Sequence, residues 1–576
     1  MTTAHAVLPA QIEPKDGISY VCGRTDVPLS EATVGEFLAQ TAQRFADRLA
    51  VVFREQGVRW TWREFAHEVD VLAAGLVALG LGKGDRIGIW SPNRVEWLIT
   101  QLATARIGAI LVNINPAYRL AELEYALNKV GCRAIIAAEQ FKSAQYLEML
   151  QTLAPELAQH APGELHAARL PALRHVIRMG AGHTPGMLRY EDLVQQGRCE
   201  LDVARLDTIG DTLGANDPIN IQFTSGTTGN PKGATLTHRN IVNNARFIAM
   251  CMRFTERDRL CVPVSLYHCF GMVLAVLACV STGAAMVFPG EGFDPAATLA
   301  AVSDEQCTAL HGVPTMFIAE LDHPDFDKYD LSHLRTGVMA GSPCPIKTMK
   351  RVVARMHLSE VTTAYGMTET SPVSFQSSIS DPLEKRTTTA GRIQPHLEAK
   401  IVDAFGNIVP VGETGELCIK GYSVMRGYWN DDEKTREAIV DDWMHTGDLA
   451  TLDADGYCSI IGRLQDKVLR DGRNIYPREI EEFLFRHPKV QSAQIFGVPD
   501  SKYGEELCAW IVLHPGEVAI EQDIHDFCHG QLAHYKVPRH VRFVSALPMT
   551  VTGKVQKFVM RAKMIDELKR SSDKIA

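Results

Sequence analysis

Short apolar runs alternate with helical patterns through the first half of this chain, and that alternation limits the folds it can adopt. Residues 86–90 (RIGIW) and 133–138 (RAIIAA) have the β-branched and apolar composition of buried strands. Residues 97–115 between them carry first a helical pattern and then a strand-like run. Strands separated by helices favour βαβ units, in which parallel strands are covered by helices. The pattern predicts an α/β fold.

The domain organisation follows from two changes in the predicted secondary structure towards the C-terminus. From about residue 398 the strands are shorter and separated by Gly and Pro turns, which is typical of a small β-rich subdomain. After residue 463, helices and strands again alternate over about a hundred residues, a normal domain size. Since 576 residues are too many for one hydrophobic core, we expect several domains. They are a large N-terminal domain of parallel-sheet α/β subdomains plus the β-rich subdomain (1–462), a joining segment (463–467) and a small α+β C-terminal domain (468–576).

Composition excludes several classes of partner. The net charge of −9 gives no global attraction to nucleic acid or to acidic membranes, so an anionic ligand must be bound by local groups. Thirteen cysteines without a C-x-x-C pair favour a reducing compartment and buried thiols over disulfides or a cysteine zinc site. The first thirty residues include Glu13, Asp16 and Asp26 and lack the apolar core of a signal peptide. We therefore expect a cytoplasmic protein without a nucleic-acid partner.

One uncharged segment, residues 261–290, is long enough to suggest a membrane span. Pro263 and His268 interrupt its beginning, and the STG at residues 281–283 interrupts its middle. A short buried helix at residues 271–280 followed by a buried strand at 284–288 explains the pattern better, so we expect no transmembrane segment.

The stretch FTSGTTGNPKGATLTH, residues 223–238, is rich in glycine and hydroxyl side chains. It follows a strand-like IQF and precedes a helical pattern after His238, so we expect a loop between a strand and a helix. Such a loop offers backbone N–H groups and hydroxyls to phosphate oxygens, and Lys232 adds a charge suited to a β- or γ-phosphate. The G-x-x-x-x-G-K-[ST] pattern is absent, because Gly233 follows Lys232. Alone, a loop of this composition is more often a plain turn.

This loop does not stand alone. SGTTGNPKG closely resembles the phosphate loop of the adenylate-forming superfamily, which includes acyl-CoA synthetases, aryl-CoA ligases, luciferases and peptide-synthetase adenylation domains. Four more stretches resemble the family's other motifs, in the family's order, and the resemblance extends from about residue 34 to 561. They are YGMTE (365–369), TGD (446–448), GRLQDK (462–467) and TGKVQK (552–557).

The resemblance implies the roles of the catalytic residues. Lys554 is placed over the reacting carboxylate and the α-phosphate, where a fixed ammonium compensates developing charge. Thr368 is suited to hydrogen-bond the α-phosphate, and Glu369 offers a hard oxygen ligand for Mg²⁺. His268 lies in a segment similar to P-L-[FY]-H-x-x-G, although Ser265 replaces its proline. We expect His268 to line the space between the acyl and nucleotide sites and not to act as a general base.

The same resemblance implies the nucleotide contacts. Tyr365 is placed to stack on adenine, and Asp448 and Arg463 to bind the ribose. Taken singly, Glu369, Asp448 and Lys554 are equally explained as a surface acid, a turn aspartate and a solvated lysine. The complete set expected to bind ATP or coenzyme A is Thr224, Ser225, Gly226, Thr227, Thr228, Gly229, Lys232, Gly341, Ser342, Pro343, Tyr365, Gly366, Asp448, Arg463, Gly472 and Lys554.

The implied reaction has two halves and uses ATP, Mg²⁺ and coenzyme A. A carboxylate attacks the α-phosphate and releases pyrophosphate, and the coenzyme A thiol then attacks the acyl-adenylate and releases AMP. In the family, the C-terminal domain rotates about a hinge between the halves, and Asp466 matches that hinge. Gly472 would let the pantetheine arm pass close to the backbone. Asp471 and Arg473 depart from the G-G-E-N-I-Y-P that is common in this family.

The substrate class also comes from resemblance. LYHCFG, GYSVMRGYWND, NIYPREIE and residues 441–463 are most similar to medium- and long-chain fatty acyl-CoA synthetases. Two alternatives stay open: an aryl- or branched-chain-acid CoA ligase, and an acyl-AMP ligase that loads a carrier protein. A homodimer and a peripheral membrane contact are compatible with the resemblance.

Overall fold

The structure is a computed structural model that describes residues 13–224, 230–342, 344–471, 473–500, 503–550 and 555–573. The chain divides into two compact units. Residues 22–398 and 419–444 belong to the first unit, and residues 13–21, 399–418 and 445 onward belong to the second. The domain boundaries expected at residues 462 and 468 stay a prediction.

The first unit contains an eight-stranded sheet whose central strands are parallel. Its order is β10-β9-β6-β4-β5-β11-β12-β22, with parallel pairing from β10 to β11 and antiparallel pairing for β12 and β22. The buried, β-branched composition of β4, β5 and β6 is typical of strands covered on both faces. The strands are β4 (Arg86–Trp90), β5 (Ile110–Asn113), β6 (Ala134–Ala137), β9 (His175–Arg178), β10 (Leu188–Arg189), β11 (Pro218–Thr224), β12 (Lys232–Thr237) and β22 (Gly427–Tyr428).

A nine-stranded sheet forms the other half of the first unit. Its order is β19-β18-β17-β16-β15-β13-β14-β2-β3, and the six strands from β17 to β2 are parallel. The antiparallel strands β3, β18 and β19 form its edges. The strands are β2 (Leu49–Phe53), β3 (Val58–Thr61), β13 (Arg259–Cys261), β14 (Ala285–Phe288), β15 (Ala309–Leu310), β16 (Thr336–Ala340), β17 (Glu360–Gly366), β18 (Val373–Gln376) and β19 (Arg392–Ile393).

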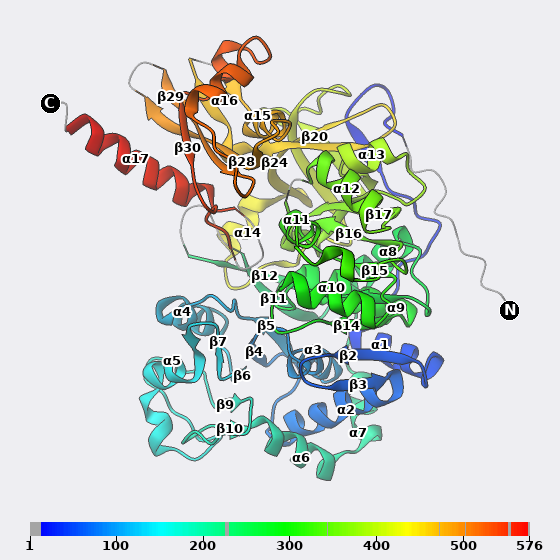
Figure 1. Ribbon diagram of the computed structural model, residues 1–576. Helices are drawn as coiled ribbons and strands as arrows, with labels where there is room; N and C mark the ends of the chain where they lie inside the picture. The colour runs from blue at the N-terminus through cyan, green and yellow to red at the C-terminus, as the bar shows by residue number, and fades with distance from the viewer. Residues whose placement is uncertain are drawn as a thin grey trace. The chain divides into compact units, whose positions relative to one another are not determined.

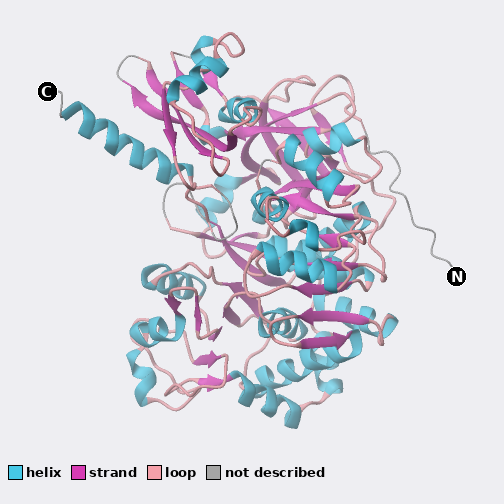
Figure 2. Ribbon diagram, in the orientation of Figure 1, coloured by secondary structure: helices cyan, strands magenta, loops and turns pink. Residues whose placement is uncertain are grey.

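Helices alternate with the strands of both sheets, as the cyan and magenta ribbons of Figure 2 show. Local signals set several helix starts: Thr33 with Glu36, Thr61 with Glu64, and Thr237 with Asn240 form capping boxes. This arrangement confirms the predicted α/β class. The helices of the first unit are α1 (Val34–Arg44), α2 (Trp62–Ala78), α3 (Val95–Arg106), α4 (Leu120–Val130), α5 (Tyr146–Leu153), α6 (Tyr190–Glu200), α7 (Val203–Gly210), α8 (His238–Cys251), α9 (Ala278–Thr282), α10 (Pro295–Asp304), α11 (Pro314–Leu321), α12 (Ile346–Arg355), α13 (Leu383–Thr388) and α14 (Asp432–Ala438).

The uncharged segment forms a buried helix and strand, as predicted. Its first part, η2 (Phe270–Leu277), is a π-helix, which continues as α9 and is followed by β14. Two buried side chains bind carbonyl groups of this helix: Gln101 donates to Met272 O at 3.1 Å and His311 Nε2 donates to Leu274 O at 3.2 Å. None of the described helices is long and apolar enough to span a membrane.

Two smaller sheets are built around the β-rich segment and the C-terminal α+β segment that the sequence predicts (Figure 1). One has the order β1-β20-β21-β24-β23, with β25 paired to β24; the other has the order β27-β26-β29-β28, with β30 paired to β29. The strands are β1 (Tyr20–Cys22), β20 (Leu397–Val402), β21 (Gly415–Gly421), β23 (Ile439–Val440), β24 (Trp443–Leu452), β25 (Cys458–Arg463), β26 (Val468–Arg470), β27 (Arg473–Ile475), β28 (Val490–Asp500), β29 (Gly504–Leu513) and β30 (His540–Phe543). The helices are α15 (Pro477–Leu484), α16 (Glu521–Cys528) and α17 (Lys557–Asp573).

The cysteines behave as the composition predicts. All thirteen lie within described ranges and are free thiols, and ten of them are buried. Burial raises the pKa of several thiols, for example that of Cys132 to about 12, so they stay protonated near neutral pH.

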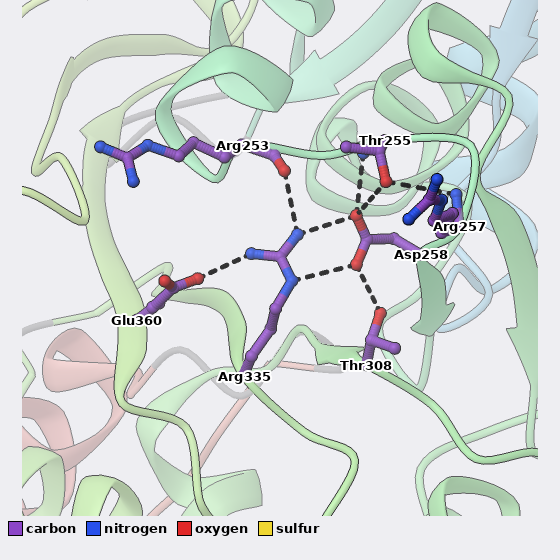
Figure 3. Close-up of a pocket in the computed structure, with 7 residues that line it drawn as sticks. All are labelled: Arg253, Thr255, Arg257, Asp258, Thr308, Arg335 and Glu360. Carbon is purple, nitrogen blue, oxygen red and sulfur yellow. Dashed lines mark hydrogen bonds and ion pairs between the residues drawn. The ribbon is translucent and has the colours of Figure 1, made fainter. Parts of the chain in front are cut away.

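An ion cluster ties together the amino ends of four parallel strands in the nine-stranded sheet. Arg335 donates to both oxygens of Asp258 at 2.8 and 3.1 Å and to Glu360 at 2.7 Å (Figure 3). Thr308 donates to Asp258 at 2.7 Å, and only 5% of the Asp258 side chain is exposed. The cluster lines a surface cavity of about 500 Å³. Because ligands of α/β sheets bind at the carboxyl ends of the strands, we interpret this cluster as a structural one.

Replacing Arg335 by Ala should lower the free energy of unfolding by about 2–3 kcal/mol, since the buried Asp258 carboxylate loses its bidentate partner. Chemical denaturation followed by circular dichroism measures the change. Arg351 provides a matched control, because its side chain is as exposed as that of Arg335 while its partner Asp322 is 34% exposed where Asp258 is 5% exposed. Arg351→Ala should cost about 1 kcal/mol or less. Equal losses in the two variants would contradict a special role for the buried pair.

Candidate active site

The glycine- and hydroxyl-rich stretch joins two strands and not a strand and a helix. β11 ends at Thr224, β12 begins at Lys232, and these two residues are antiparallel Cα partners. The helix predicted after His238 is confirmed as α8, but the loop predicted up to that residue is too long, because the Thr-rich GATLT at its end forms part of β12. The predicted contacts Ser225, Gly226, Thr227, Thr228 and Gly229 lie outside the described residues. Thr224 and Lys232 flank them on adjacent strands.

Glu369 lies in a short 3₁₀ turn, η4 (Thr368–Thr370), shortly after β17 ends. Its side chain is buried, and its Oε1 accepts hydrogen bonds from Thr224 Oγ1 at 3.1 Å and from Tyr428 OH at 2.9 Å. Lys232 Nζ donates to the same Tyr428 hydroxyl at 3.1 Å. The structure thus brings Thr224, Lys232 and Glu369 together around one tyrosine.

The two other predicted nucleotide motifs end neighbouring parallel strands. Gly341 and Ser342 follow β16, and Tyr365 and Gly366 end β17, with Ala340 and Ala364 as Cα partners. Both motifs therefore lie at the carboxyl edge of the nine-stranded sheet, the usual ligand edge of such sheets. A Cβ on Gly366 would lie 1.7 Å from the carbonyl oxygen of Pro372, so only glycine fits there. Pro343 lies outside the described residues.

His268 precedes the π-helix. Its Nδ1 accepts the backbone N–H of Phe270 at 3.1 Å, which leaves Nε2 to carry the proton of the neutral ring. The neighbouring Cys269 is buried, and its Sγ lies 3.7 Å from His268 Nδ1 and 3.9 Å from Thr368 Oγ1. His268 and the predicted α-phosphate contact Thr368 are therefore joined through one thiol.

Buried amides hold this histidine segment in place, and they were not identified from the sequence. Asn113 donates to Tyr267 O at 2.7 Å, and Gln222 accepts the Cys269 backbone N–H at 3.1 Å. Asn220 connects the two: it donates to Asn113 and accepts from Gln222, at 3.0 Å each. The three amides stand on β5 and β11, so the ends of these strands fix the position of His268. A polar residue inside an otherwise apolar strand is the only local signal of such a network.

Asp448 and Arg463, the predicted ribose contacts, lie together in the second unit. They are Cα partners on β24 and β25, with Arg463 Nε 3.4 Å from Asp448 Oδ1. The TGD motif itself lies within β24, where Glu416 accepts from Gly447 N at 3.1 Å and pairs with His445 Nδ1 at 2.9 Å. The ribose-type motif is thus part of a strand and not an open loop.

Three donor atoms beside this motif, on β21 and β24, could hold a metal ion. Glu416, Cys418 and His445 each place one within 4.8 Å of the others, and Cys418 Sγ lies 3.5 Å from His445 Nδ1. Burial, and then the Glu416 carboxylate, raises the pKa of Cys418 to about 12, and a protonated thiol is a poor ligand. Glu416 already binds this part of β24 with both oxygens. We interpret this trio as a hydrogen-bonded cluster that holds the TGD motif in place.

The remaining predicted residues belong to the C-terminal part. Asp466, the predicted hinge, ends a short 3₁₀ turn (Leu464–Asp466) that follows β25. The substituted Asp471 has a left-handed backbone with φ of 51°, and the Arg473 guanidinium lies 4.7 Å from the Tyr535 ring centroid. Gly472 and Lys554 lie outside the described residues. Lys554 directly precedes Val555, which forms an isolated bridge with Met549.

A buried carboxylate near a lysine, at the carboxyl edge of a mostly parallel sheet, is typical of the nucleotide site of an α/β enzyme. The chain belongs to the AMP-binding enzyme family: residues 38–429 match the model of the AMP-binding enzyme, and residues 479–554 match the model of its C-terminal domain.

Named relatives cover nearly the whole chain. A putative acyl-CoA synthetase, YngI of Bacillus subtilis (strain 168), is 48% identical over 546 residues, which are 94% of this chain and 99% of the relative. The mitochondrial medium-chain acyl-CoA ligase ACSF2 of Danio rerio is 47% identical over 554 residues, 96% of this chain and 91% of the relative. Among solved structures, the anthranilate CoA ligase AuaEII in complex with anthranoyl-AMP aligns with a TM-score of 0.82 and 27% identity, covering 94% of this chain and 98% of that one.

Proposed function

We propose that this enzyme activates a medium- or longer-chain fatty acid with ATP and transfers the acyl group to coenzyme A. The observation that carries the proposal is the identity of 44–48% to proteins named acyl-CoA synthetase or medium-chain acyl-CoA ligase, over at least 94% of the chain. The anthranilate ligase, at 27% identity, is a more distant relative. A straight-chain acid is therefore favoured over an aryl acid.

In the first half-reaction, the substrate carboxylate attacks the α-phosphorus of ATP and pyrophosphate leaves. Thr368 hydrogen-bonds the α-phosphate, Lys232 binds the β- or γ-phosphate, and Lys554 compensates the charge that gathers on phosphorus. Tyr365 stacks on the adenine, which Gly341, Ser342 and Pro343 border, while Asp448 and Arg463 hold the ribose. The product is an acyl-adenylate, a mixed anhydride.

Mg²⁺ is the metal that this chemistry requires, and Glu369 fits it. The carboxylate is buried, and the two described donors, Thr224 and Tyr428, bind only its Oε1, so a second hard oxygen is available to a cation. When bound, Mg²⁺ would offset the negative charge of the phosphates. Glu369 is the residue we propose to hold it.

In the second half-reaction, the thiol of coenzyme A attacks the acyl carbon and AMP leaves. The proposal includes rotation of the C-terminal part about Asp466 and passage of the pantetheine arm beside Gly472. Asp471 adds an acidic group next to that passage, and it is the residue to examine if the thioester half proves slow. A cytoplasmic location and a homodimer stay predictions from the sequence.

The test is a panel of acids from acetate through octanoate to palmitate, with benzoate and cinnamate. Pyrophosphate release and AMP release dependent on coenzyme A are measured for each acid. We expect kcat/KM to rise from acetate towards octanoate, because each buried methylene contributes about 0.8 kcal/mol. A preference for benzoate would support an aryl-acid ligase instead. Pyrophosphate release without any dependence of AMP release on coenzyme A would point to a carrier protein as acceptor.

A further inference from the structure

The hydroxyl of Tyr428 lies between the side chains of Glu369 and Lys232. We propose that Glu369 binds the metal of MgATP and that Lys232 binds its outer phosphates. The Tyr428 hydroxyl donates to Glu369 Oε1 at 2.9 Å and accepts from Lys232 Nζ at 3.1 Å. The same ammonium group lies 4.4 Å from the centroid of the Tyr428 ring, within cation–π range. One side chain therefore connects the expected ligand of the metal with the expected ligand of the outer phosphates.

The backbone around Tyr428 is fixed to both of these partners. On one side, Trp429 N–H donates to Gly233 O at 2.8 Å, and Tyr428 is the Cα partner of Ala234 on β12, the strand that Lys232 begins. On the other side, Met425 N–H donates to the backbone oxygen of Glu369 at 2.9 Å. The Tyr428 side chain is only 5% exposed. Its hydroxyl thus has a defined position relative to Glu369 and Lys232 before any nucleotide binds.

A phenol suits this position better than a charged donor. The phenol of tyrosine ordinarily titrates at about pH 10, so the hydroxyl that donates to Glu369 is a neutral donor at neutral pH. A neutral donor orients the carboxylate without cancelling its charge. Thr224 donates to the same Glu369 oxygen, Oε1. Among the described groups, these two donors therefore leave the other carboxylate oxygen, Oε2, available to a cation. A lysine or arginine in this place would neutralise Glu369 and weaken its attraction for a metal.

Lys232 has to leave the tyrosine in order to reach a phosphate. Its contacts with the hydroxyl and the ring are ones that a flexible four-carbon side chain exchanges readily. The Tyr428–Glu369 hydrogen bond, in contrast, joins side chains whose backbone is fixed by hydrogen bonds on both sides of Tyr428. The Lys232–Tyr428 contact should therefore break more easily than the Tyr428–Glu369 hydrogen bond.

We propose that Tyr428 is a positioning residue that holds the Glu369 carboxylate ready for the metal and holds Lys232 until the triphosphate replaces it. The proposal rests on the proposed function, because it takes the roles of Glu369 and Lys232 from there. Tyr428 touches neither substrate nor metal in this scheme and acts through its two partners.

The experiment compares Tyr428→Phe with Tyr422→Phe in the full-length enzyme. Tyr422 is the matched control, because its hydroxyl belongs to the same segment but pairs with Asn244 at 3.3 Å. Steady-state pyrophosphate release is measured at saturating fatty acid while MgATP is varied. We expect Tyr428→Phe to raise KM for MgATP by about 10- to 100-fold, the loss typical of a hydrogen bond to a charged group, with a much smaller change in kcat. Tyr422→Phe should leave KM unchanged.

The same measurement in a Glu369→Gln background shows whether Tyr428 acts through the Glu369 carboxylate or independently of it. If Tyr428 acts through the Glu369 carboxylate, Tyr428→Phe should have little further effect once that carboxylate is gone. Equal effects in both backgrounds would overturn the positioning role, and so would an unchanged KM in Tyr428→Phe. If Glu369→Gln by itself leaves pyrophosphate release intact, the assignment of the site fails and not merely the role of Tyr428. Thr224→Val removes the second donor to the same oxygen and should raise KM in the same direction, which provides a readout if Tyr428→Phe folds poorly.

Discussion

Lys554→Ala should reduce acyl-adenylate formation by about a thousandfold while it leaves the thioester half-reaction nearly intact. A fixed ammonium at the reacting carboxylate and α-phosphate matters where charge develops, and loss of one such preorganised group typically costs two to three orders of magnitude in rate. The second half-reaction forms no new charge on phosphorus, so it does not need this lysine. The variant should also bind ATP and fatty acid almost as tightly as the parent, because the contribution is specific to the transition state.

Two assays separate the halves. Single-turnover release of pyrophosphate reports adenylate formation, and conversion of added acyl-adenylate by coenzyme A reports thioester formation. Lys563→Ala is the control, since Lys563 is an exposed lysine on α17 in the same C-terminal segment. An equal loss in both halves would mean that the C-terminal part is disturbed as a whole. Unchanged pyrophosphate release would contradict the role of Lys554.

The secondary structure that the sequence predicts correctly is the part set by local composition. The β-branched runs at 86–90 and 134–137 form β4 and β6, and the uncharged segment folds as a helix and a strand. The pattern fails at residues 232–237, where the structure has a strand in place of the expected loop. This strand exists because it pairs with β11 on one side and β22 on the other. β22 lies almost two hundred residues further along the chain, so no local window contains that information.

In the candidate site, too, some residues could be predicted from the sequence and others could not. Motifs place Thr224, Lys232 and Glu369 in the site by type and order, and the structure brings these three together. Tyr428 lies in GYSVMRGYWND, which marks the family without indicating what the tyrosine contacts. Its hydrogen bond to Glu369 joins residues that are 59 apart in the sequence. The buried amide of Asn113 bonds across 154 residues to Tyr267. Hydrogen-bond partners of this kind follow only from the packed fold, because sequence spacing does not define them.

Glu369→Gln should lower kcat/KM for MgATP by about a hundredfold or more. The substitution keeps the shape of the side chain and keeps an oxygen that accepts hydrogen bonds from Thr224 and Tyr428, so the local structure should persist. It removes the negative charge and the second carboxylate oxygen, which are what a hard cation binds. Additional fatty acid should not restore the rate, because the loss lies in the metal–nucleotide complex.

Glu320 provides a control, because it is a second buried carboxyl group of the first unit to which no role in the reaction is assigned. Burial raises the pKa of Glu320 and so favours its neutral form. Glu320→Gln should therefore leave pyrophosphate release unchanged. If Glu369→Gln behaved like Glu320→Gln, the carboxylate would be a structural acceptor for Thr224 and Tyr428 and not a metal ligand. If only Glu369→Gln loses activity, the negative charge at that one position is what the reaction requires.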